Sequence, residues 1–152
     1  MLASFALQDV EADAIYRLQS FWSAEGKLRR ETVYDLHLEP SWSGHGVRAE
    51  RFGTVGSMPV RKYFPFLALE DSRTGHVTAI QLYVGASWQM EVSCREKSGR
   101  LTVTGGLADR EFGHWTRTVA PGESFTTPQA VIAQGEDLYQ ACARLVAAQH
   151  PA

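Results

Sequence analysis

The clearest pattern in the chain is an alternation of apolar and polar residues between Trp88 and Arg95. Apolar side chains occupy every second position, at Trp88, Met90, Val92 and Cys94. The intervening positions are polar: Gln89, Glu91, Ser93 and Arg95. Because successive side chains of a strand point to opposite faces, this predicts a strand with one buried and one solvated face. A turn-like Glu96–Gly99 and a second strand at 101–104 would complete an antiparallel hairpin.

Similar short segments occur along most of the chain. We predict further strands at 15–22, 32–39, 64–69, 77–84 and 130–133, separated by turns at 23–26, 71–75 and 121–122. Pro40 ends the second of these strands because it cannot donate to a ladder. Residues 41–62 are rich in glycine and show little periodicity, so they are interpreted mostly as a loop.

The pattern changes after Gly135. In 136–149, Leu138, Ala141, Cys142 and Leu145 recur at helical spacing among alanines, which favour helix. One C-terminal helix after about eight short strands predicts an all-β fold, an antiparallel β-sandwich with a single helix at its end.

Composition narrows the class of protein. The 152 residues suit a single domain, and 44% hydrophobic with 21% charged residues is typical of a globular protein. The net charge of −2 offers no basic field for nucleic acid or for a membrane surface. The start of the chain lacks a basic segment and soon meets Asp9, so it makes a poor signal peptide. These features predict a cytoplasmic protein with no nucleic-acid or membrane partner. Cys94 and Cys142 are expected to be buried free thiols.

No motif for catalysis, phosphate binding or metal binding occurs. The five histidines lie far apart, so we predict no metal site, and nothing in the sequence implies a cofactor. Three carboxylate pairs stand out: Glu70 with Asp71, Asp109 with Glu111, and Glu136 with Asp137. The first lies beside a turn and the third at a helix start, where acidic groups favour the helix dipole. The middle pair is interpreted as part of a turn.

The tryptophans fall into two groups. Trp88 belongs to the apolar side of an alternating strand, so we expect it in the core. Trp42 lies in a loop of small residues close to Arg48 and Arg51, where contact with a ligand or with a protein partner is equally compatible with the sequence.

Several segments resemble a known family: FWSAEGKLRRE, SWSGHG, FGTVGSMPVRKYFPFLALED, GASWQMEV, GGLADREFGHW and PGESFTTPQA. Their order and spacing resemble the N-terminal β-domain of α-galactosidases of glycoside hydrolase family 36. The most specific pieces are 121–130 and 87–92, and the resemblance extends from about Phe21 to the end. In that family the domain is a two-sheet β-supersandwich, and a helix connects it to a (β/α)₈ barrel.

The resemblance implies a division of the chain at Gly135. Residues 1–135 would be the later half of that β-sandwich, and 136–152 a linker helix towards a catalytic barrel that this chain lacks. The family's catalytic aspartates belong to the barrel, so no residue here inherits a catalytic role, and the chain alone is expected to be inactive. The expected function is a non-catalytic fragment of an enzyme that hydrolyses terminal α-galactosides. Its partners would be the barrel, galactosides and further copies of the chain.

By the same analogy, the loop from Trp42 to Lys62 is the best candidate for contact with substrate or barrel. The residues proposed for this contact are Trp42, His45, Arg48, Arg51, Met58, Arg61 and Lys62. Loop arginines are suited to bind sugar hydroxyls or barrel carboxylates.

Three functions remain open at this level. The first is the α-galactosidase domain, and the second is a free-standing carbohydrate-binding β-sandwich. The third, a small enzyme with its own site, would need histidines and carboxylates that converge in a cleft. Half a sandwich would leave strand edges and an apolar sheet face uncovered, which predicts a homodimer or a higher oligomer.

Overall fold

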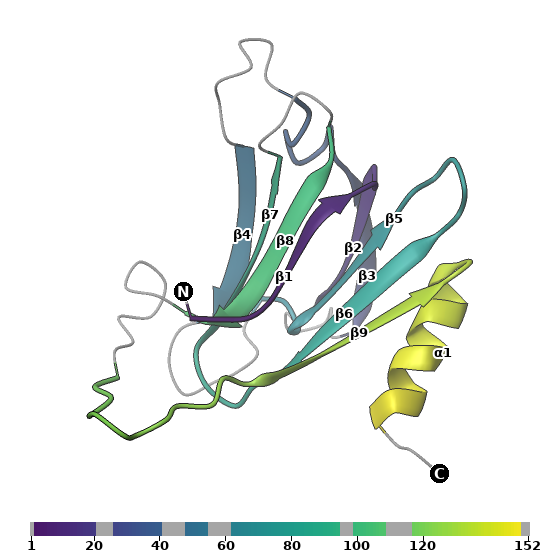
Figure 1. The fold of residues 1–152 in the computed structure, drawn as a ribbon. Coiled ribbons are helices and arrows are strands. Elements are labelled where there is room, and N and C mark those ends of the chain that lie inside the picture. The colour runs from purple at the N-terminus through teal and green to yellow at the C-terminus, as the bar shows by residue number, and fades with distance from the viewer. Residues whose placement is uncertain are drawn as a thin grey trace.

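The fold is a two-sheet antiparallel sandwich with one helix on its outside (Figure 1). The computed structural model describes residues 2–20, 26–40, 48–54, 62–94, 99–108 and 117–149. One sheet has the order β1-β8-β7-β4 and contains Leu2–Val10, Leu101–Leu107, Trp88–Cys94 and Arg48–Thr54. The other has the order β3-β2-β5-β6-β9 and contains Lys27–Thr32, Ala14–Gln19, Phe66–Glu70, Val77–Tyr83 and Gln129–Gly135. The predicted all-β sandwich with one C-terminal helix is therefore confirmed.

The second half of the chain follows the sequence pattern closely. β7 and β8 pair antiparallel in a continuous register from Trp88 opposite Leu107 to Cys94 opposite Leu101. β6 and β9 lie where strands were predicted, and α1 spans Leu138–Gln149. Asp137 Oδ1 accepts the backbone N–H of Gln140 at 2.7 Å, which satisfies an otherwise unpaired donor of the first helical turn.

The strand predicted at 32–39 is wrong. β3 lies earlier, at Lys27–Thr32, and residues 33–37 form a turn. The Asp35 carboxylate accepts the backbone N–H of Thr32 at 2.9 Å, and the Thr32 hydroxyl accepts the N–H of Asp35 at 3.1 Å. Such local side-chain bonds compete with a strand ladder and explain why alternation did not produce a strand here. Tyr34 is exposed as a result, whereas Leu38 is buried in the core.

The loop predicted over 41–62 contains a strand, which is a second correction. β4 spans Arg48–Thr54 and pairs with β7 along its whole length. Its charged residues weakened the apolar alternation, but Phe52 and Thr54 are buried on one face. β1 was not predicted either. Most of its residues are at least partly exposed, and its register with β8 is irregular at two places.

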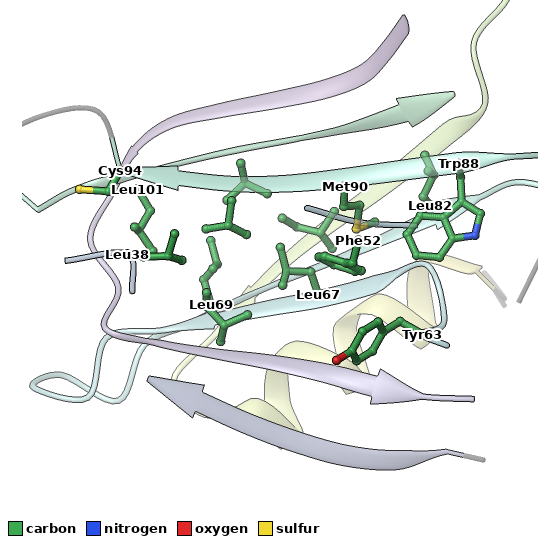
Figure 2. Packing of buried hydrophobic residues seen from close by; sticks show 14 residues of the cluster. Leu38, Phe52, Tyr63, Leu67, Leu69, Leu82, Trp88, Met90, Cys94 and Leu101 are labelled. Atoms are coloured by element: carbon green, nitrogen blue, oxygen red, sulfur yellow. The ribbon is translucent and has the colours of Figure 1, made fainter. Parts of the chain in front are cut away.

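The main core fills the space between the sheets (Figure 2). Trp88 is fully buried, as predicted, and its ring meets Phe52 edge to face with 5.8 Å between centroids. Phe52 makes a second edge contact with Tyr63 at 5.5 Å. Cys94 is buried at the opposite end of this core beside Leu101. Neither cysteine forms a disulfide, and Cys142 is half-buried rather than buried as expected.

A second, smaller core joins α1 to the outer face of the five-stranded sheet. Ala141 and Leu145 of the helix pack with Phe66, Ala68, Val77 and Ala79. Both faces of this sheet are therefore covered at β5 and β6, which explains why Ala68 and Leu67, neighbours in β5, are both fully buried. No helix in the described part of the chain is long and apolar enough to cross a membrane.

Candidate functional site

The residues predicted to contact substrate or barrel divide into two groups. Trp42, His45, Met58 and Arg61 lie outside the described residues. Arg48 and Arg51 belong to β4, and Lys62 follows the second undescribed part of the same segment.

Arg48 and Arg51 are directed to opposite faces of their strand. Arg48 shares the parity of buried Phe52 and bonds Glu39 at 3.1 Å. Arg51 lies on the outer face of the sheet, where its Nε is 2.5 Å from Glu91 of β7. The Lys62 ammonium is 5.4 Å from the centre of the Tyr63 ring. These three side chains thus do not converge on one position, and their role as a contact surface stays a prediction.

A buried charge centre that the sequence did not reveal lies between the sheets. Arg17 of β2 is 2% exposed, and its guanidinium bonds Glu31 of β3 at 2.6 Å and Glu50 of β4 at 3.0 Å. The same guanidinium lies over the Tyr63 and Phe52 rings, 4.4 and 5.2 Å from their centres. One side chain therefore connects an edge strand of each sheet.

Arg17 stays charged despite its burial. Desolvation alone would lower the pKa of Arg17, but the bonds to Glu31 and Glu50 outweigh it and raise the pKa above its ordinary value. Its Nε atom has no hydrogen-bond partner among the described residues. Arg17 shares the inner face of β2 with Ile15. From the sequence alone, a charged residue in a strand would be assigned to the solvated face.

A charged cleft opens at the end of the sandwich where β1 turns into β2 and β5 into β6. Its volume is about 520 Å³. The lining includes Asp9, Glu11, Leu69, Asp71, His76 and Ile132. An adjoining hollow of about 400 Å³ shares Glu11 and Asp71 and adds Tyr34, Arg73 and Arg100.

The charges of this cleft bond to one another. Arg73 bridges Asp71 at 3.2 Å and Glu11 at 3.3 Å, and Arg100 reaches Glu11 at 3.3 Å. The bond from the Arg73 guanidinium lowers the pKa of Asp71. Burial raises the pKa of Asp13, but bonds from the Ser72 hydroxyl and backbone outweigh it and lower that pKa overall.

An apolar groove lies at the opposite end, along the connection from β8 to β9. It is lined by Leu2, Tyr83, Leu107, Val119 and Phe125, and the Arg117 guanidinium lies 5.4 Å from the centre of the Phe125 ring. The 121–130 segment, the most specific part of the family resemblance, contributes to this groove.

The described residues gather charged side chains at one end of the sandwich and apolar ones at the other. Within the described ranges, no group of three or more His, Cys, Asp and Glu residues could hold a metal ion. Of the first carboxylate pair, Asp71 lines the charged cleft, whereas Glu70 bonds Tyr16 and Arg30 instead. Glu136 and Asp137 precede α1, and Asp109 and Glu111 lie outside the described residues. In the sequence, the cleft is marked only by the turn at 71–75 and by the acidic segment 9–13. These two segments come together only in the tertiary fold.

No family model matches this sequence, and no curated protein matches it. Among solved structures, the fold is similar to part of the alpha-galactosidase from Lactobacillus brevis, with a TM-score of 0.61 and 20% sequence identity. The similar region covers 86% of this chain and 16% of that enzyme's chain. At this identity the likeness concerns the fold.

Proposed function

We propose that this chain is a non-catalytic β-sandwich domain of an α-galactosidase related to glycoside hydrolase family 36. The observation that carries the proposal is the extent of the structural likeness: nearly the whole chain corresponds to a small part of an alpha-galactosidase. The sequence resemblance points to the same kind of enzyme, most specifically through 87–92 and 121–130.

In this role the domain contributes structure rather than chemistry. Its tasks are to support the barrel, to assist oligomerisation and to present the 42–62 segment to substrate or barrel. The division into a sandwich at 1–135 and a helix at 136–152 that leads to the barrel belongs to the same proposal. The enzyme as a whole would hydrolyse terminal α-galactosides, and this chain alone would not.

A free-standing carbohydrate-binding module is the second candidate. The charged cleft favours it, because carboxylates and arginines in a hollow of about 520 Å³ can bond the hydroxyls of a small sugar. Leu69 and Ile132 add an apolar wall on which the less polar face of a sugar can rest.

The first experiment combines a hydrolysis assay with a binding titration of the purified chain. With p-nitrophenyl α-galactoside we expect no turnover above the buffer control, because in the family that the sequence resembles the catalytic aspartates belong to the barrel. Galactose and melibiose are then titrated by calorimetry and by tryptophan fluorescence, with mannitol as a control polyol.

The outcomes separate the candidates. If the chain shows a cooperative thermal transition but no turnover and no saturable binding, the result favours the non-catalytic domain of a larger enzyme. Saturable binding of galactose that Asp71→Asn weakens would favour the carbohydrate-binding module. Turnover by the purified chain would overturn the non-catalytic assignment.

A further inference from the structure

The described part of the sandwich has four edge strands, and three of them carry a feature that discourages pairing with another chain. β3 contains Lys27, Arg29, Arg30 and Glu31. β4 contains Arg48, Glu50 and Arg51. β1 is interrupted by two register irregularities, between Ala3 and Phe5 and between Leu7 and Val10. Charges and bulges at an edge are the usual devices against edge-to-edge association.

β9 has none of these features. The strand reads QAVIAQG, with neither a charged residue nor a proline between Gln129 and Gly135. It keeps a continuous register with β6 over all seven residues, and no described strand pairs with its other edge. Ile132, in the middle, lies opposite Ile80 on the inner side of the sheet, at the rim of the charged cleft, and is 41% exposed. A straight, uncharged and partly apolar edge is a template for a further strand.

We propose that β9 is a self-association edge, at which a second copy of this chain adds its own β9 antiparallel about a twofold axis. The two five-stranded sheets would then form one continuous sheet across the dimer. A second copy fits this edge because antiparallel pairing of an uncharged strand with itself sets no like charges opposite each other. Pairing through β3 would instead oppose cations with cations.

The elements beside β9 contact its two faces, and none of the described strands among them pairs with its second edge. α1 covers the outer face of the sheet through Ala141 and Leu145, and the main core covers the inner face. Arg144 of the helix donates to the Gln134 carbonyl at 2.7 Å, near the end of β9, so the uncharged run that remains is centred on Val131 and Ile132. Figure 1 shows β9 as the outermost strand of its sheet. β1 of the other sheet contacts β9 from the inner side and lines the charged cleft with it, but the two strands do not pair.

The experiment compares two substitutions on the two edges of the same sheet. Ile132→Lys places a charge on β9, and Leu28→Lys places one on β3, where Leu28 is 44% exposed. Molar mass is measured by light scattering after size exclusion over a wide range of chain concentration. We expect the unmodified chain and Leu28→Lys to reach twice 16.9 kDa, and Ile132→Lys to stay at 16.9 kDa.

Hydrogen exchange gives an independent readout. Backbone amides of 129–135 should exchange more slowly as the unmodified chain is concentrated, and those of 27–32 should not change. Thermal melting verifies that both variants fold. A monomeric unmodified chain, or a dimer that survives Ile132→Lys, would overturn the proposal, and a dimer lost only in Leu28→Lys would assign the contact to β3. None of these outcomes depends on whether the chain belongs to an α-galactosidase.

Discussion

At the scale of single residues, Arg17 is the side chain whose position departs most from sequence expectation. It lies on a strand whose neighbours Ile15 and Gln19 are buried with it, and it reaches Glu31 and Glu50 on two other strands. Two charge-assisted bonds and the faces of two aromatic rings compensate the loss of water around the guanidinium. Arg17 therefore holds both sheets together on the side of β3 and β4.

Arg17→Met should destabilise the fold strongly. The substitution leaves the Glu31 and Glu50 carboxylates without their shared cation, and breaking a buried ion pair from one side costs about 3 kcal/mol of unfolding free energy. The matched control is Arg30→Met, which breaks the more exposed pair with Glu70 and should cost less than about 1 kcal/mol. Urea denaturation measures both, and equal losses would contradict the special role of Arg17.

At the scale of elements, the glycines of β8 show how closely two strands approach. Gly106 lies opposite Ala3 beside an irregularity of β1, and a Cβ atom at Gly106 would collide with the Leu2 carbonyl oxygen and the Ser4 backbone. The absence of a side chain thus permits β1 to pair with β8 at its bulge.

Gly106→Ala should loosen or displace β1. Since the new methyl group would meet backbone rather than a movable side chain, we expect a loss of about 3 kcal/mol, at the upper end of overpacking effects. Gly85→Ala is the control, because no described atom lies within 4 Å of the position that its methyl group would take, and its stability should be nearly unchanged. Hydrogen exchange of 2–10 reports on β1 directly; protection equal to that of the unmodified chain would refute the collision.

The elements also show where sequence pattern succeeds. The bounds of β7 were predicted almost residue for residue because its inner face is wholly apolar and its outer face polar. The expectation that the polar face is solvated was wrong, since Gln89 and Ser93 are buried. The pattern at 32–39 was equally regular, but Thr32 and Asp35 bond each other's backbone and close a turn instead. Periodicity indicates which residues can share a face of a strand, but it does not predict local side-chain bonds that close a turn.

At the scale of the whole molecule, the position of α1 bears on where the domain ends. The helix was predicted as a connection towards another domain, and in the structure it also packs on β6 and β9 through Ala141 and Leu145. Without it, Phe66, Val77 and Ala79 would face water on the outer side of the sheet.

Leu145→Ala tests whether the helix is integral to the fold. If it is, the cavity left between helix and sheet should cost about 3 kcal/mol of unfolding free energy. Val146→Ala alters the next residue, which is 55% exposed, and should change stability by less than about 0.5 kcal/mol. Thermal and urea unfolding distinguish the two; equal, small effects would make α1 a detachable linker.

One candidate site was chosen from the sequence, and another became visible only in the structure. The 42–62 segment was selected from its aromatic and basic residues, yet Arg48 and Arg51 prove to lie on opposite faces of β4. The charged cleft was not anticipated, because Asp13 and Ser72 are far apart in the sequence and meet only where two turns come together. Residue types alone do not predict which turns share an end of a sandwich.

The sequence by itself determined the fold class, the β7–β8 hairpin and the C-terminal helix, because each depends on local periodicity and on turn or capping residues. The resemblance to α-galactosidases read from the sequence stays a prediction, and the structural likeness bears on the fold. Only the tertiary structure decided which strands became edges, which charge was buried between the sheets, and which side chains gathered at each end. Those features depend on strand order and register, which arise from contacts between residues distant in the chain.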